Sequence, residues 1–229
     1  MDEKISSGCE MMDKLLDGGY ESDVITSIYG PAGTGKTTLC LLASIQVSKT
    51  KKIIFIDTEG GFSITRLSQL TPDYKSVIEK IFILRPTNFE EQRKAFEKLK
   101  AEVNEKIGLI VVDTVSNLYR AEYKKEDIAE TNRSLGTQLS VLVEIARKNK
   151  IPVLLTNQVY ASFDDKSKIN IVGGDLLNYR SKCLIELQSS HGSKRKAILR
   201  KHRSLPQREI VYEIKEQGLF EVKGGFRMF

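Results

Sequence analysis

The sequence lacks the features of a membrane-spanning or disulfide-stabilised protein. It has no tryptophan and only three cysteines, Cys9, Cys40 and Cys183, which stand far apart without a CxxC spacing. An odd number of scattered cysteines argues against a disulfide framework and against a zinc site. No apolar run reaches the roughly 18 residues of a membrane-spanning helix, and no apolar segment of the secretory type follows Met1. We therefore expect a soluble, cytoplasmic protein.

The length and composition favour a single folded domain. The 229 residues suffice for one enlarged α/β domain but not for two full-sized domains. Hydrophobic residues make up 40% of the chain and charged residues 29%, a balance that supports a packed core and argues against disorder. No linker, internal repeat or low-complexity tract divides the sequence. We expect residues 1–229 to form one domain.

The net charge of +6 is concentrated in residues 191–208. This segment has seven Lys and Arg residues and no acidic residue, whereas the rest of the chain has 29 basic and 30 acidic residues. Six of these cations form what we call the basic strip: Lys194, Arg195, Lys196, Arg200, Lys201 and Arg203. Such a strip is typical of a surface that binds nucleic-acid phosphates, because each neutralised phosphate releases counterions. The alternative is a solvated hairpin edge protected by its charges.

The pattern of apolar segments predicts an α/β fold with a mostly parallel sheet. Short runs rich in β-branched residues alternate with longer stretches of helical period. The predicted strands are residues 24–29, 52–57, 81–84, 109–113 and 153–156, and the predicted helices are residues 37–49, 89–104 and 127–149. After Gly173 and Gly174 come four shorter segments, residues 182–188, 196–200, 209–214 and 219–222. We expect these four segments to extend the sheet as antiparallel strands.

The most specific motif is a complete GxxxxGK[ST] element that follows a predicted strand and opens a predicted helix. It consists of Gly30, Pro31, Ala32, Gly33, Thr34, Gly35, Lys36 and Thr37, and Thr38 comes next in the helix. Its glycines allow backbone N–H groups to turn inward around a phosphate at the helix N-terminus. We expect Lys36 to reach the β and γ phosphates and Thr37 to bind Mg²⁺. The motif therefore predicts a nucleotide site.

Asp113 is the candidate acidic group for the magnesium ion. It ends the apolar segment 109–112, which can be buried on both faces of a parallel sheet. Its side chain then emerges at the carboxyl edge of the sheet, beside the phosphate loop, where it can hold the water shell of the metal. The alternative is an ordinary turn aspartate that ends a strand.

Hydrolysis of a bound nucleotide also needs a group that activates or orients water. Glu59 comes two residues after the predicted strand 52–57, which places its carboxylate at the same edge as Lys36 and Asp113. Gln158 follows the strand 153–156 and can sense the γ phosphate through its amide. We expect Glu59, Lys36 and Gln158 to support catalysis. The alternative for Glu59 and Gln158 is an ordinary role as loop caps.

Motifs along nearly the whole chain resemble the core of the RecA-type recombinases. They lie at residues 5–8 and 12–19, 56–62 around Glu59, Asp113, 156–159 around Gln158, 173–174 and 201–206. The resemblance implies a RecA-like P-loop ATPase core that binds ATP and DNA in homologous recombination and DNA repair. It gives Glu59 the role of activating the attacking water. It gives Gln158 the role of linking the nucleotide to a DNA-binding loop.

The same resemblance places two DNA-facing loops after Asp113 and after Gln158. The cations of these loops are further candidates for DNA contacts: Arg120 in the first loop, and Lys166 and Lys168 in the second. The expected ligand is single-stranded DNA, with double-stranded DNA as a second candidate. Asp164 and Asp165 nearly cancel the charge of the second loop. We therefore expect no strong DNA affinity from that loop alone.

The chain also departs from the strand-exchange enzymes of this superfamily. Those enzymes carry an N-terminal helical domain and a linker whose aromatic residue docks on the neighbouring subunit, whereas this sequence starts almost directly at the core. The resemblance therefore implies an accessory or mediator of the main, RadA-type recombinase, with weak or DNA-modulated ATP hydrolysis. A homodimer is the candidate assembly, and the expected location is the nucleoid region of the cytoplasm.

Two other classes of function stay open. One is a kinase-type or KaiC-like P-loop ATPase that acts on protein partners, although the sequence has no evident arginine-rich lid and such proteins usually lack a basic strip. The other is an ATP-gated binding module without meaningful turnover. The sequence does not separate this module from an ATPase, because Glu59 and Gln158 indicate a capacity for hydrolysis and not a rate.

Overall fold

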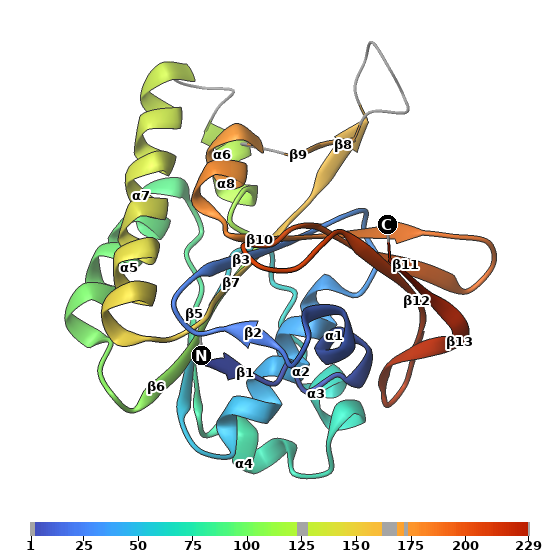
Figure 1. Ribbon diagram of the computed structural model, residues 1–229. Coiled ribbons are helices and arrows are strands. Elements are labelled where there is room, and N and C mark those ends of the chain that lie inside the picture. The colour runs from blue at the N-terminus through green and yellow to red at the C-terminus, as the bar shows by residue number, and fades with distance from the viewer. Residues whose placement is uncertain (1–2, 123–127, 162–168, 172–173, 229) are drawn as a thin grey trace.

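A single mixed sheet forms the centre of the molecule. The computed structural model describes residues 3–122, 128–161, 169–171 and 174–228. Within these ranges nine strands form the main sheet, and helices cover both of its faces (Figure 1). In spatial order the strands are β13 (Gly218–Met228), β12 (Arg208–Lys215), β11 (Lys194–Lys201), β10 (Cys183–Ser189), β3 (Ile25–Tyr29), β7 (Val153–Asn157), β6 (Ile107–Asp113), β4 (Lys52–Asp57) and β5 (Ile81–Leu84). The predicted α/β class is confirmed.

The direction of pairing divides the sheet into two parts. Strands β10, β3, β7, β6, β4 and β5 pair in parallel, and strands β10 to β13 pair antiparallel. The expected antiparallel extension is therefore confirmed for β11, β12 and β13. It is wrong for one side of β10, which pairs parallel with β3 through Cys183 and Thr26. The short helix α8 (Gly174–Arg180) lies directly before β10. It is part of the connection that brings the chain back to the end of the sheet where β3 begins, as a parallel strand requires.

The central strands are apolar because they are buried on both faces. Along β4, Phe55 belongs to the hydrophobic core on one face, and Ile54 and Ile56 belong to the core on the other. Successive side chains of a strand point to opposite faces, so a strand between two helical layers needs apolar residues at nearly every position. This burial brings the polar ends of the strands to one edge of the sheet.

Two helical layers close the cores. One core includes side chains of α1 (Glu10–Leu16) and α2 (Lys36–Ser48), and α3 (Ile64–Leu70) and α4 (Tyr74–Ile78) lie on the same side (Figure 1). The other core is covered by α5 (Phe89–Glu102), α6 (Asn117–Glu122), α7 (Ile128–Asn149) and α8. Helix α5 begins at the N-cap Asn88, whose side chain accepts a hydrogen bond from the Glu91 backbone N–H.

Two small strand pairs lie outside the main sheet. Strands β1 (Lys4–Ile5) and β2 (Tyr20–Glu21) pair beside α1, and strands β8 (Val159–Ala161) and β9 (Ile169–Ile171) pair with each other after the end of β7 (Figure 1). Neither pair is predicted from the sequence. In the part of the chain that the structure describes, none of the helices is long and apolar enough to cross a lipid bilayer.

Candidate nucleotide site

The carboxyl ends of four neighbouring parallel strands meet at one open cavity of about 300 Å³. Strand β3 leads into the phosphate loop, and β4, β6 and β7 end beside it. In the strand register Asp57 lies opposite Asp113, and Tyr29 lies opposite Asn157. Among the residues that line the cavity are Lys36, Thr37, Glu59, Asp113 and Gln158. The structure thus brings together all five side chains that we expected at the sheet edge.

The phosphate loop has the backbone that an anion site requires. Gly33 and Gly35 have φ angles of 74° and 94°, in the left-handed region that favours glycine. Gly35 is the N-cap of the 13-residue helix α2 and, having no side chain, cannot cap the first N–H groups of that helix. The first N–H groups of α2 and its helix dipole are therefore directed at the cavity, where a phosphate can accept from them.

Lys36 lies folded over its own loop. Its ammonium group donates to the carbonyl oxygens of Gly30 and Pro31, both at 2.8 Å. Burial lowers the pKa of Lys36, and the nearby carboxylates of Asp113 and Glu59 partly oppose that shift. The charge is thus positioned at the loop and is desolvated, so an anion that enters the cavity interacts with it strongly.

Thr37 and Asp113 form the candidate magnesium site. The Thr37 hydroxyl donates to one carboxylate oxygen of Asp113 at 2.6 Å, and the Thr156 hydroxyl donates to the other. Asp113 is only 3% exposed, and this burial raises its pKa, while the two hydroxyl hydrogen bonds lower it. Hard oxygen donors of this kind suit Mg²⁺.

The magnesium site is incomplete as a cage of protein ligands alone. Among the described residues no group of three or more His, Cys, Asp or Glu side chains could hold a metal ion. Magnesium characteristically keeps several waters and binds one or two protein oxygens together with substrate phosphates. The pair of Thr37 and Asp113 fits this mode. Sequence reasoning missed Thr156, although its place at the end of β7 beside Asp113 is a usable signal.

Glu59 and Gln158 are in direct contact across the cavity. The Gln158 side-chain amide donates to both carboxylate oxygens of Glu59, at 2.9 and 3.1 Å. The Thr114 hydroxyl donates to the same carboxylate at 3.0 Å. Gln158 is followed immediately by β8. The carboxylate at the end of β4 is therefore linked directly to the start of the segment after β7.

Asp57 supports the turn that carries Glu59. Its buried carboxylate accepts hydrogen bonds from the backbone N–H groups of Gly61 at 2.9 Å and Phe62 at 3.2 Å. Asn117 also donates to the Thr58 carbonyl at 2.9 Å. Asp57 is thus a structural acceptor that holds this turn. Asn117 is a supporting residue that sequence reasoning missed.

The fold separates the basic strip instead of gathering it. Arg195 donates to the carbonyl oxygen of Gly33 in the phosphate loop at 2.9 Å. Neighbouring residues of a strand point to opposite faces, and Lys196 accordingly points away from the loop and pairs with Glu209 at 3.1 Å. The six cations therefore do not share one surface.

Three cations of the basic strip have carboxylate partners. Besides the pair of Lys196 and Glu209, Arg200 pairs with Glu186 at 2.6 Å, and Arg203 pairs with Glu21 at 2.9 Å. Within the described residues, neither Lys194 nor Lys201 has an ion pair; Lys201 donates to the Asn178 carbonyl. The role of the strip in binding DNA stays a prediction, and Lys194 and Lys201 are its most available cations.

The two loops of the resemblance are described in part. Arg120, expected in the first loop, lies exposed on the helix α6 in the segment after Asp113. Lys166 and Lys168 of the second loop lie outside the described residues. The strands that flank them, β8 and β9, pair antiparallel through Val159 and Ile171. The DNA contacts assigned to both loops stay predictions.

Comparisons with known proteins agree with this architecture. The Rad51 family model matches residues 3–222. The chain is 37% identical to the DNA repair and recombination protein RadB of Methanobrevibacter smithii, over 91% of this chain and 92% of the relative. It is 40% identical to the protein of that name from Methanococcoides burtonii, over 90% of this chain and 92% of the relative. A solved structure described as a crystal structure of the RadB recombinase is 34% identical, with a TM-score of 0.82, and the match covers 96% of this chain and all of that one. The chain therefore belongs to the Rad51 family and, within it, to the archaeal RadB proteins.

Proposed function

We propose that this protein acts in homologous recombination and DNA repair as an ATP- and DNA-binding accessory of the main, RadA-type recombinase. In this proposal residues 1–229 work as one RecA-like ATPase core, and ATP hydrolysis is weak or modulated by DNA. The printed names of the relatives, DNA repair and recombination proteins, support the general role. The finer statements rest on the geometry of the site.

Binding of ATP with Mg²⁺ is supported by the phosphate loop and the residues around it. ATP supplies the phosphoryl group that would be transferred to water. The N–H groups at the start of α2 and the ammonium of Lys36 would hold its phosphates. Thr37 and Asp113 would hold the magnesium ion, because their oxygens already lie 2.6 Å apart at the cavity.

The observation that carries the proposal is the pair of hydrogen bonds between Gln158 and Glu59. A general base must have a carboxylate oxygen free to accept a proton from water. Here both oxygens of Glu59 accept from the Gln158 amide. A carboxylate oxygen can accept more than one hydrogen bond, so an attacking water would have to share Glu59 with this amide, which supports slow hydrolysis. Because Gln158 leads directly into β8, DNA that reorders the following loop would change this contact.

A protein partner is supported by one edge of the sheet. Strand β5 has no neighbour on its outer side among the described residues. Its side chains Phe82 and Leu84 are 49% and 37% exposed. Exposed apolar side chains on an uncovered edge strand are typical of surfaces that pair with another chain. The RadA-type recombinase is the partner we propose, and a homodimer is the alternative that the same edge allows.

Nucleotide affinity tests the first part of the proposal. Lys36→Ala removes the charge that neutralises the β and γ phosphates, and Lys49→Ala removes an exposed lysine near the end of the same helix. Titration calorimetry with Mg-ADP should give a clear binding isotherm for the unaltered chain and for Lys49→Ala, and none for Lys36→Ala. Circular dichroism and thermal melting establish that all three are folded. Equal affinities in all three proteins would refute the site.

A further inference from the structure

Two consecutive carbonyl groups of the phosphate loop are held by the antiparallel end of the sheet. The Tyr212 hydroxyl on β12 donates to the Thr34 carbonyl at 2.6 Å. The Arg195 guanidinium on β11 donates through Nε to the Gly33 carbonyl at 2.9 Å. Arg195 and Tyr212 are direct cross-strand neighbours in the pairing of β11 with β12. Both contacts to the loop thus come from one place in the sheet.

Apolar side chains close the remaining space behind the loop. A Cβ atom placed on Gly35 would lie 3.1 Å from Ile214 Cδ1 and 3.3 Å from Leu219 Cδ2. Both distances are shorter than ordinary van der Waals contacts, so a side chain at Gly35 would be crowded by β12 and β13, which lie close behind this part of the loop. Tyr212 itself is fully buried. The loop therefore lies against the two strands and is not free to move toward them.

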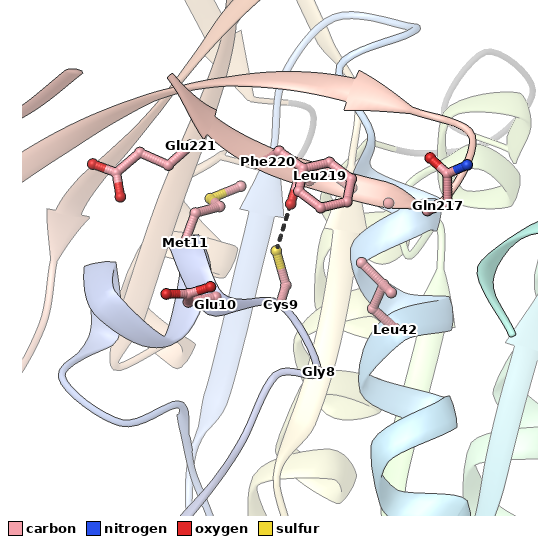
Figure 2. A pocket seen from close by; sticks show the side chains of 10 residues that line it. Gly8, Cys9, Glu10, Met11, Leu42, Gln217, Leu219, Phe220 and Glu221 are labelled. Carbon is pink, nitrogen blue, oxygen red and sulfur yellow. Dashed lines mark hydrogen bonds between the residues drawn. The ribbon is translucent and has the colours of Figure 1, made fainter. Parts of the chain in front are cut away.

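The supporting strands are themselves anchored by further contacts. Arg66 donates to the carbonyl groups of Lys215 and Glu216 at the turn between β12 and β13. Figure 2 shows the neighbouring cavity, where the Cys9 thiol faces this hairpin and donates to the Leu219 carbonyl at 3.6 Å. The hairpin is thus tied to α3 and to the residue that precedes α1, and it can act as a fixed support.

We infer that Tyr212 is a positioning residue for the phosphate loop, and that Arg195 provides the second contact of the same support. The inference rests on the proposed nucleotide function. In a planar trans peptide the C=O and N–H groups point in opposite directions. Holding the carbonyls of Gly33 and Thr34 outward therefore aims the N–H groups of Thr34 and Gly35 inward, toward a bound phosphate.

The hydroxyl of Tyr212 is suited to this role. Burial raises its pKa, so the hydroxyl stays protonated and donates throughout the neutral range. The Thr34 side chain donates to the Pro31 carbonyl at 2.8 Å, so the loop has one contact of its own in addition to those from the sheet. Loss of the tyrosine hydroxyl should leave the loop folded but less well ordered.

A pair of tyrosine variants tests the inference. Tyr212→Phe removes the hydroxyl that contacts the loop, and Tyr20→Phe removes another buried hydroxyl, which has no hydrogen-bond partner among the described residues. Mg-ADP affinity should fall about three- to tenfold in Tyr212→Phe, which is the range that one lost neutral hydrogen bond predicts. It should stay unchanged in Tyr20→Phe.

Hydrogen exchange separates positioning from a merely structural role. The backbone amides of residues 33–37 should exchange faster in Tyr212→Phe, while those of the central strands β6 and β7 keep their protection. If Tyr212→Phe fails to fold, Arg195→Gln serves as the second variant. Lys75→Gln, at an exposed lysine of α4, is then the control for the lost charge, and the same weakening of Mg-ADP binding is expected only for Arg195→Gln.

The outcomes distinguish this inference from the proposed function. Mg-ADP affinity and loop exchange equal to those of the unaltered chain, in the folded Tyr212→Phe or Arg195→Gln protein, would overturn the inference alone. Absence of nucleotide binding in the unaltered chain would instead overturn the proposed function on which the inference rests.

Discussion

Two double variants of the basic strip test whether it contacts DNA phosphates directly. Lys194→Gln with Lys201→Gln removes two cations that lack carboxylate partners in the described part of the chain. Lys196→Gln with Arg200→Gln removes two cations that already pair with Glu209 and Glu186. Both variants lower the net charge by the same amount. A difference between them therefore reports direct contacts and not the overall charge.

The size of the expected difference follows from counterion release. Each phosphate contact contributes about 0.7 to the slope of log affinity against log salt for single-stranded DNA. Loss of two contacts should lower the steepness of this slope by about 1.4. For a tenfold rise in salt, the factor by which the affinity falls should then be about 25 times smaller in the variant than in the unaltered chain. The paired cations already neutralise carboxylates, so their removal should change the slope much less.

Fluorescence anisotropy with a labelled single-stranded oligonucleotide, at four or more salt concentrations, gives the three slopes. A second oligonucleotide of different sequence checks that the loss is independent of sequence, as phosphate contacts require. Equal slopes for the unaltered chain and both variants would remove the basic strip from the DNA site. A larger change of slope in Lys196→Gln with Arg200→Gln than in Lys194→Gln with Lys201→Gln would refute the argument that ion-paired cations contribute less to DNA binding.

Two further predictions concern the nucleotide site. Asp113→Asn keeps the size of the side chain and one oxygen that can accept from a threonine hydroxyl, but it loses the charge that attracts the metal. The affinity for ADP should then no longer depend on Mg²⁺. Calorimetry with and without Mg²⁺ measures this, and an unchanged Mg²⁺ dependence would contradict it. Burial lowers the pKa of Lys36 from the ordinary lysine value of 10.5, and the neutral amine cannot balance phosphate charge. Mg-ADP affinity should therefore decline with rising pH before 10.5 is reached, and a constant affinity up to that pH would refute the assignment.

The parallel half of the fold and the nucleotide site could be predicted because their signals are local. Strands buried on both faces appear as continuous apolar runs, and parallel strands bring their carboxyl ends to one edge. Glu59 and Asp113 lie at or just after the end of such a run, and Lys36 begins the helix that follows one, so position along the chain was enough to bring them together. The contact between Glu59 and Gln158 is a consequence of the same rule.

The antiparallel half was less predictable because its interactions join distant segments. The residues of β10 do not indicate whether the neighbouring strand runs parallel or antiparallel, and β10 has a neighbour of each kind. The sequence around the basic strip does not show which acidic residues pair with its cations, because those residues lie far away in the chain. Arg203, for example, pairs with Glu21 near the other end of the chain. A charge count along the sequence identifies cations, but only the fold shows which of them are already neutralised.

The shortest elements carry too little periodicity for a prediction. Helix α4 has five residues, and strands β1 and β2 have two residues each. Such segments are too short to repeat the hydrophobic period of a helix or a strand even twice, and that period is the main signal in a sequence. Tyr212 illustrates the same limit at the level of the site, because its contact with Thr34 joins residues 178 positions apart.

The central claim is that Glu59 activates water for ATP hydrolysis and that DNA modulates this step through Gln158. The most direct measurement is the rate of phosphate release from Mg-ATP, with and without single-stranded DNA, for the unaltered chain and for Glu59→Gln. We expect slow release that DNA changes in the unaltered chain, and no release under either condition in Glu59→Gln, because the amide has the shape of the carboxylate without its basicity. Equal rates for the two proteins, unaffected by DNA, would contradict the claim.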